Sequence, residues 1–217
     1  MTGDMRIDRY EWRGGSETML RFGPADGPQV IAALPLFEEA NRTRAAMVDV
    51  LRRLAAKGIG GVVPDLPGTG ESTVATADAR LADWRAAFAS AGAALDRPYV
   101  VAWRGGALVD AGAEAAGRWH LSPVEGMRVV TELRRIRSTA GSKDYAGNVI
   151  ADALIDQLAA ASPAAGARTV RLASDPAPAD RHIDGPALWR GIEPGVNVGL
   201  QQAIADDIAD WIARCEG

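Results

Sequence analysis

The sequence predicts an α/β protein built on a doubly wound, mostly parallel sheet with helices on both faces. Three observations lead to this prediction. Strand-length apolar runs alternate with helical patterns along the chain, which is the order of a parallel α/β sheet. Residues 99–106 join a strand to a sharp turn of small residues. The 217 residues, 47% hydrophobic and 24% charged, suit one globular core, so we expect a single domain over residues 1–217.

The first two elements are predicted to pair as a hairpin. Residues 7–12 and 19–22 are short strand candidates, and residues 13–15 (RGG) between them can form a tight turn. The dipeptide Gly23-Pro24 ends the second strand, because proline cannot continue a sheet ladder.

A strand, a helix and another strand follow. Residues 30–34 and 59–63 are continuous apolar runs, as expected for strands that are covered on both faces of a parallel sheet. Between them, the polar segment 35–44 leads into a helix predicted over residues 45–57, where apolar residues recur at spacings of three and four. Gly58 ends this helix, because glycine readily adopts the left-handed conformation of a helix C-terminus.

The middle of the chain contains a strand, a turn and a helical pattern in succession. A helix is predicted over residues 79–95, and Pro98 separates it from the next strand. That strand, residues 99–101, runs into the turn 102–106 and then into a helical pattern over residues 107–117.

The last third of the chain continues the alternation of strands and helices. A polar, glycine-containing surface loop is predicted over residues 138–147, and too few residues follow the turn for a large lid. In such sheets ligands bind at the carboxyl ends of the strands. The other elements predicted here are strands over residues 119–124 and 168–173 and helices over residues 127–136, 149–158 and 200–213.

The strand, turn and helical pattern around residue 104 have the shape of a nucleophile elbow. The elbow motif is G-x-S-x-G, and in this chain Ala102 takes the place of the first glycine and Gly106 that of the last. The central position, where the motif has serine, is Arg104. Arginine stays charged at any working pH and cannot act as a covalent nucleophile. The sequence therefore predicts an α/β-hydrolase-like scaffold without its attacking hydroxyl.

Four segments together resemble one branch of the α/β-hydrolase superfamily, the exosortase A system-associated hydrolase of the second type. This resemblance implies the α/β-hydrolase fold, a hydrolase by fold analogy, and a setting beside exopolysaccharide and protein-sorting loci. Members of that family also carry arginine at the elbow. The four segments are residues 35–44 (PLFEEANRTR), 65–72 (DLPGTGES), 103–108 (WRGGAL) and 119–126 (WHLSPVEG).

The rest of a catalytic triad has only weak candidates. An α/β-hydrolase orders its triad as serine, acid and histidine along the chain. Asp175 follows the predicted strand 168–173, where the acid belongs. The same aspartate can instead be a turn-forming residue before a proline. Residues 193–197, where the histidine belongs, contain none. His182 lies in a predicted loop, and we favour a surface side chain over a catalytic one there. His120 lies in a predicted strand, and we favour a buried histidine with hydrogen-bond partners over a catalytic one. Ser72 is expected to serve its own turn.

Polar residues from two strand ends form the expected binding site. We predict an ion pair between Arg104 and Glu38 or Glu39, either as a structural bridge that closes the vacated site or as part of a pocket. In such a pocket Arg104 and the backbone amides of Phe37 and Gly105 hold a carboxylate or phosphate. Asn41 adds a polar side chain, and Trp103 adds an apolar wall or packs in the core.

Two classes of function follow from these residues. The first is a degenerate hydrolase that binds a small anionic ligand or a partner protein. The second is an esterase or thioesterase with an unorthodox constellation, in which His182, Asp175 or Glu38 activates water. A nucleotide-binding protein is disfavoured, because no G-x-G-x-x-G follows the first strand and no P-loop is present. We expect no cofactor and no metal.

Composition narrows the partners and the compartment. A net charge of −4 without a long basic run gives no reason to expect nucleic acid, and we interpret the basic cluster Arg134, Arg135 and Arg137 as a solvated helix face. No apolar run reaches membrane-spanning length. The charged N-terminal residues and the single cysteine, Cys215, predict a cytoplasmic protein.

Overall fold

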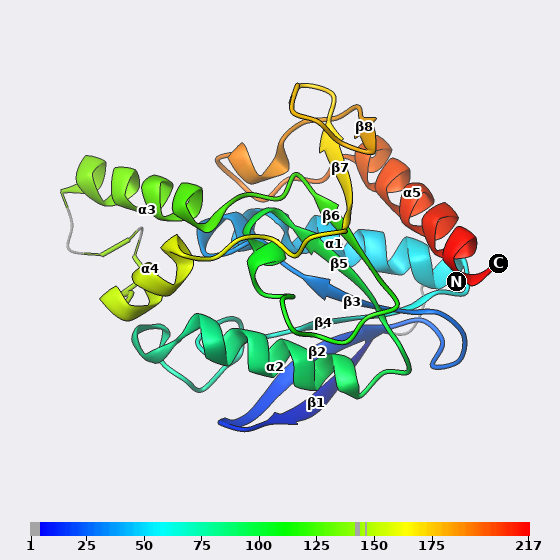
Figure 1. The fold of residues 1–217 in the computed structure, drawn as a ribbon, viewed down its shortest axis with the longest axis horizontal. Coiled ribbons are helices and arrows are strands. Elements are labelled where there is room, and N and C mark those ends of the chain that lie inside the picture. Colours follow the sequence, from blue (N-terminus) through cyan, green and yellow to red (C-terminus); the bar gives the residue numbers. More distant parts are fainter. Residues whose placement is uncertain (1–4, 142–143, 146) are drawn as a thin grey trace.

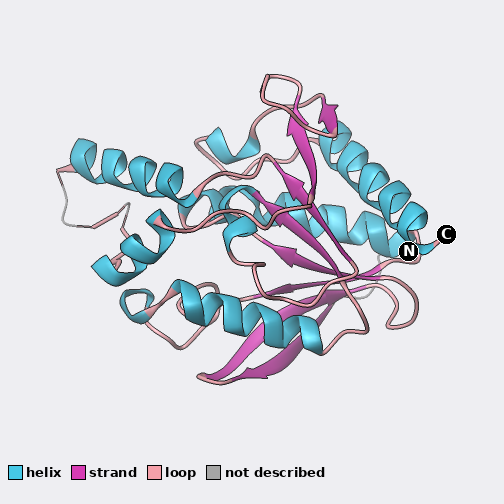
Figure 2. Ribbon diagram, in the orientation of Figure 1, coloured by secondary structure: helices cyan, strands magenta, loops and turns pink. Residues whose placement is uncertain are grey.

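A computed structural model describes residues 5–141, 144–145 and 147–217, and these residues form an eight-stranded sheet with helices on both faces (Figures 1 and 2). The strands are β1 (Arg6–Trp12), β2 (Gly15–Phe22), β3 (Gln29–Ala33), β4 (Gly60–Pro64), β5 (Tyr99–Trp103), β6 (Gly117–Leu121), β7 (Arg168–Leu172) and β8 (Arg181–Ile183). The helices are α1 (Glu38–Ala56), α2 (Leu81–Ala93), α3 (Gly126–Ala140), α4 (Asp152–Ala159) and α5 (Val198–Glu216), with short 3₁₀ helices η1 (Thr76–Asp78), η2 (Arg104–Leu108) and η3 (Leu188–Arg190).

The sheet is mostly parallel, with the order β1-β2-β4-β3-β5-β6-β7-β8. The predicted hairpin is confirmed, since β1 pairs antiparallel with β2, and β2 pairs antiparallel with β4. All pairs from β4 to β8 are parallel. The chain first adds β4 on one side of β3 and then returns to add β5 on the other, so the direction of winding reverses between β3 and β5.

Two apolar layers cover the two faces of this sheet. Side chains of successive strand residues point to opposite faces, and in β5 Val100 and Ala102 join one core cluster while Val101 and Trp103 join the other. Residues of α2, α3 and α4 complete the first cluster, and residues of α1 and α5 complete the second. Both faces of the central strands are therefore buried, as their continuous apolar runs predict.

Helix α1 corrects one expectation, because it begins at Glu38 and not at residue 45. Two acidic residues, Glu38 and Glu39, lie in its first turn, where carboxylates stabilise the positive end of the helix dipole. Asn41 and Arg44, in the polar segment 35–44 expected to precede the helix, are therefore helical.

The helix expected over residues 107–117 is also wrong, since only the 3₁₀ helix η2 forms after β5. The backbone carbonyls of Asp110 and Ala113 accept hydrogen bonds from the Arg118 side chain, and the Asp110 carbonyl also accepts one from the Ala113 N–H in a single turn. Gly112 has a φ of +92°, which ends any right-handed helical path there.

The remaining differences are at element ends. The strand expected over residues 119–124 spans Gly117–Leu121, and β8, which contains His182, is a short strand in place of the expected loop. The loop expected over residues 138–147 is partly helical, because α3 extends to Ala140, and its residues 142, 143 and 146 lie outside the described part. Among the described helices, none is both long and apolar enough to cross a lipid bilayer.

Candidate functional site

The reversal of winding between β3 and β5 places a crevice at the carboxyl ends of these two strands. In open α/β sheets, ligands bind in the crevice at such a switch point. The segment after β3 leads into α1 and carries Phe37 and Glu39, and the turn after β5 carries Arg104 and Gly105. The topology therefore brings together side chains that lie far apart in the sequence.

The backbone is strained at these strand ends. Of the four described non-glycine residues with positive φ, three lie near the carboxyl ends of strands that meet at the crevice. Arg104 (54°) and Ser122 (45°) directly follow β5 and β6, and Phe37 (54°) lies four residues after β3, at the start of α1. Such conformations cost about 1–3 kcal/mol each and gather at functional sites. A positive φ at Arg104 is the sharp strand-to-helix turn of a nucleophile elbow.

Gly106 explains how the elbow can approach β3. A Cβ atom at this position would lie 2.4 Å from the carbonyl oxygen of Leu34 and 2.6 Å from that of Ala33. Both are backbone atoms of the neighbouring strand end and cannot move aside like a side chain. Only glycine therefore permits this contact between the two strand ends.

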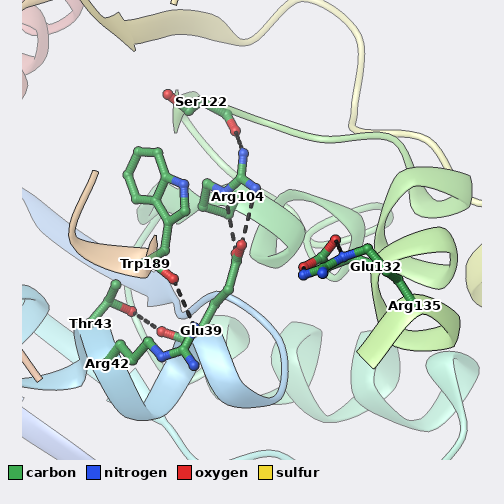
Figure 3. A network of polar contacts seen from close by, with 8 residues as sticks. All are labelled: Glu39, Arg42, Thr43, Arg104, Ser122, Glu132, Arg135 and Trp189. Atoms are coloured by element: carbon green, nitrogen blue, oxygen red, sulfur yellow. Dashed lines mark hydrogen bonds and ion pairs between the residues drawn. The ribbon is translucent and has the colours of Figure 1, made fainter. Parts of the chain in front are cut away.

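The predicted ion pair of Arg104 is confirmed, with Glu39 as the partner (Figure 3). Arg104 Nη2 lies 3.0 Å from Glu39 Oε1 and Nε lies 3.2 Å from Oε2, a two-point geometry. Nη1 donates to the Ser122 carbonyl at 3.4 Å, and the guanidinium carbon lies 4.9 Å from the centre of the Trp189 ring. The Arg104 side chain is 15% exposed and that of Glu39 28% exposed, so water reaches this pair only in part.

Glu38 has a different partner from Glu39. It forms an ion pair with Arg42, four residues along α1, at 3.7 Å. Arg42 also donates to the Trp189 carbonyl at 3.2 Å, so it connects α1 to η3 on the same side of the crevice. Trp189 is a site residue that the sequence analysis missed, because it lies in an aperiodic segment and only its residue type stands out.

The other expected binding residues are distributed unevenly. Gly105 and Phe37 border the crevice beside Arg104. Asn41 faces a separate cavity of about 590 Å³ that also borders Phe37. Trp103 is 1% exposed and belongs to the core that α1 and α5 cover, so it packs and forms no wall of the crevice.

Asp175 lies at the end of β7, as its predicted role requires, but a local network holds it. The Ala177 backbone N–H and the Arg171 guanidinium lower the pKa of its carboxyl and outweigh its partial burial. His182 Nε2 lies 3.1 Å from the Asp175 carbonyl and 3.2 Å from the Ala177 carbonyl. Since a carbonyl oxygen only accepts, this nitrogen carries a proton and is directed at the backbone, away from the Asp175 carboxylate.

His120 and Ser72 are where the simpler interpretations put them. His120 is 1% exposed, and its Nε2 lies 2.8 Å from Oδ2 of the fully buried Asp110. The Ser72 hydroxyl accepts from the backbone N–H groups of Gly68 and Val74, within its own turn, and donates to Glu17. Within residues 5–141, 144–145 and 147–217, neither histidine forms a hydrogen bond with a hydroxyl or thiol. Nor do three or more His, Cys, Asp or Glu side chains of this part group to hold a metal ion.

The comparisons with known proteins identify the fold. No protein-family model matches the chain, and no curated protein matches it. An esterase from Thermogutta terrifontis, solved with malate bound, superposes with a TM-score of 0.58 at 13% identity, covering 98% of this chain and 100% of that chain. A hypothetical protein from Pseudomonas aeruginosa gives 0.55 at 10% identity, covering 78% of each chain.

Epoxide hydrolases also resemble the chain, but over a shorter part. One from Vigna radiata has a TM-score of 0.43 at 17% identity and is matched over 54% of this chain. This chain spans about 40% of the length of that enzyme. The described sheet and its likeness to the esterase establish the α/β-hydrolase fold, without a large lid.

Proposed function

We propose that this α/β-hydrolase-fold protein uses the crevice at its elbow to bind a small anionic ligand or a partner, and not to hydrolyse a substrate. The observation that carries the proposal is the two-point ion pair between Arg104 and Glu39 at the elbow. A guanidinium cannot attack a carbonyl group, and here it is held in place by a carboxylate and an indole ring.

The two histidines support this proposal by their contacts. An elbow nucleophile needs an imidazole within hydrogen-bond reach to take its proton. His182 is exposed and bonds to backbone carbonyls, while His120 is buried against Asp110. An esterase or thioesterase would therefore need water activated by Asp175 or Glu38, both of which already have an arginine partner.

The charges around the crevice favour an anion. A cavity of about 530 Å³ lies over the elbow and is bordered by five arginines and three glutamates. Guanidinium groups bind carboxylates and phosphates through two parallel hydrogen bonds. The similar esterase was solved with malate, a small dicarboxylate, which makes malate a reasonable first probe.

The resemblance to the exosortase-associated hydrolases supplies a proposed setting. It places the ligand or partner in exopolysaccharide or protein sorting, and the single cysteine is compatible with action in the cytoplasm.

An esterase assay combined with a serine-directed probe tests the proposal. We expect the purified protein to show no turnover of p-nitrophenyl acetate above the buffer rate and no labelling by a fluorophosphonate. Ser72→Ala and Ser122→Ala variants serve to locate any label that does appear. Robust turnover together with labelling of one serine would overturn the proposal in favour of the esterase alternative.

A further inference from the structure

The crevice over the elbow continues into a second cavity at the ends of β6 and β7. The elbow cavity measures about 530 Å³ and the second about 450 Å³. The two are neighbouring parts of one crevice, because they share five lining residues. These shared residues are Arg104, Val124, Arg128, Trp189 and Arg190.

Two guanidinium groups of this crevice carry an unbalanced charge. Within the described part of the chain, the guanidinium groups of Arg128 and Arg190 have neither an ion pair nor a hydrogen bond. The Glu125 carboxylate is the only bordering carboxylate of this part that also lacks both. The two unpaired guanidinium groups and the one unpaired carboxylate therefore have a net charge of +1. The other charged residues of the crevice pair internally, as Arg42–Glu38, Arg104–Glu39, Arg135–Glu132 and Arg171–Asp175.

Arg128 lies where the two cavities meet. The Arg135 hydrogen bond lowers the pKa of Glu132, which borders the elbow cavity, and the Arg128 charge lowers it further. The Ala177 N–H lowers the pKa of Asp175, which borders the second cavity, and Arg128 again adds to the effect. Because Arg128 borders both cavities, its guanidinium can reach a ligand in either one.

Two buried polar groups at this place also lack a protein partner. Ser122, 1% exposed, borders the second cavity, and Trp189, 5% exposed, borders both cavities. Ser122 Oγ and Trp189 Nε1 are buried without any hydrogen bond among the described residues. In Figure 3 the Ser122 carbonyl points at Arg104, and its side-chain oxygen lies on the opposite side of the residue. Buried donors without partners are rare and call for an explanation such as a bound ligand.

The elbow cavity offers an apolar wall next to these donors. The wall can hold a short hydrocarbon chain, since burying each methylene contributes about 0.8 kcal/mol. The apolar side chains that border the cavity are Leu36, Phe37, Val124, Val129, Leu133 and Ile136.

We infer that the ligand is a small amphiphilic acid, whose carboxylate or phosphate lies between Arg128 and Arg190 and whose apolar body lies over the elbow. This inference rests on the proposed function and narrows it. Arg104 is neutralised by Glu39, so the unpaired guanidiniums and the Ser122 and Trp189 donors receive the acid group. All of these groups can donate to an acceptor-only oxygen.

Calorimetric titration with hexanoate, hexyl phosphate and the neutral hexanamide tests the inference. The wild-type protein should bind one or both acids at least about tenfold more tightly than the amide, because a charge-assisted hydrogen bond is about twice as strong as a neutral one. The tighter of the two acids identifies a carboxylate or a phosphate as the head group. Arg128→Gln and Arg190→Gln should each weaken its binding about five- to tenfold.

Two further variants control for unspecific effects. Arg134→Gln lies on α3, like Arg128, is exposed and borders neither cavity, so it should bind as the wild type does. Trp189→Phe keeps an aromatic ring and removes the N–H, and it should weaken the acids more than the amide. Thermal unfolding of each variant without ligand checks that it is folded.

The outcomes separate the inference from the proposed function. Acids that bind no better than hexanamide, or that bind R128Q and R190Q as tightly as the wild type, overturn the inference and leave the proposed function standing. Ester turnover with serine labelling overturns the proposed function, whatever the calorimetry gives.

Discussion

At the scale of single residues, the Arg104 guanidinium is held by the Glu39 carboxylate, the Ser122 carbonyl and the Trp189 ring. The backbone of Arg104 has the strained elbow conformation, with a φ of 54°. Its side chain, however, forms an ion pair that connects the turn after β5 to the first turn of α1. The same position thus combines a strained backbone conformation with a side chain that is held in an ion pair.

Glu39→Gln should destabilise the protein because it removes the charge that balances the half-buried Arg104. We expect a loss of about 1–2 kcal/mol in the free energy of unfolding, the value of a charge-assisted hydrogen-bond pair with partial screening. Urea unfolding at pH 7 measures it.

The neighbouring Glu38→Gln is the matched control for this substitution. It removes a first-turn carboxylate of the same helix, but its ion pair spans 3.7 Å and its side chain is 37% exposed, so a loss within about 0.5 kcal/mol is expected. Equal effects of the two substitutions would mean that Arg104 gains nothing specific from Glu39.

At the scale of elements, one buried carboxylate fastens α5 to three strands. Asp207, 1% exposed, accepts hydrogen bonds from Trp119 on β6, Arg168 on β7 and Arg181 on β8. Burial raises the pKa of Asp207, but the bonds from Arg168, Trp119 and Arg181 outweigh it, so the pKa lies below its ordinary value. The network therefore stabilises the packing of α5 against the β6–β8 side of the sheet.

Asp207→Asn should cost about 2–4 kcal/mol of stability at pH 7, because it leaves two arginines without their carboxylate. A carboxyl with a lowered folded pKa stabilises the protein above its unfolded pKa, and this contribution is lost as the pH falls through the folded value. The difference between wild type and variant should therefore shrink as the pH falls below about 4. Urea unfolding at pH 7 and at lower pH measures both.

Asp206→Asn is the control on the same helix. The Lys57 and Gln202 side chains lower the pKa of Asp206, but its side chain is 44% exposed, so water screens the charge and the change should stay within about 0.5 kcal/mol. A stability difference for D207N that did not vary with pH would contradict the assignment of its effect to the charged network.

At the scale of the whole molecule, the fold keeps the layout of a hydrolase while the reactive groups lie apart. Asp175 is at the end of β7, where an acid belongs, yet His182 on β8 bonds to its backbone and not to its carboxylate. His120 is enclosed in the core between β6 and Asp110. Among the described residues, neither histidine hydrogen-bonds to the carboxylate of Asp175.

Arg104→Ser therefore should not create an esterase. We expect p-nitrophenyl acetate turnover no higher than that of the wild type, because a serine without an imidazole partner stays a weak nucleophile. The measurement is an initial-rate assay with fluorophosphonate labelling, on protein whose thermal transition shows that it is folded. Hydrolysis with labelling of the introduced serine would mean that a base does reach the elbow.

The central strands and both faces of the sheet could be predicted from the sequence because burial leaves a continuous apolar signature. The first turn of α1 could not, since its residues from Glu38 onward are polar and give no apolar periodicity, although two of them are acidic residues in the first helical turn. The helix expected over residues 107–117 failed because only the 3₁₀ helix η2 forms after β5, and Gly112, with a φ of +92°, ends any right-handed helical path. Hydrophobic periodicity registers neither a polar helix start nor such a backbone conformation.

By itself, the sequence determined the α/β class, the elbow with arginine in place of serine, and the choice of Glu38 or Glu39 as its partner, because strand runs, glycines and charge are local properties. Only the tertiary structure decided between the two glutamates, buried Trp103 in the core, brought Trp189 to the crevice and left Arg128 and Arg190 unpaired. These outcomes depend on which side chains meet across distant strand ends. Such meetings are set by the topology and packing of the sheet and not by spacing along the chain.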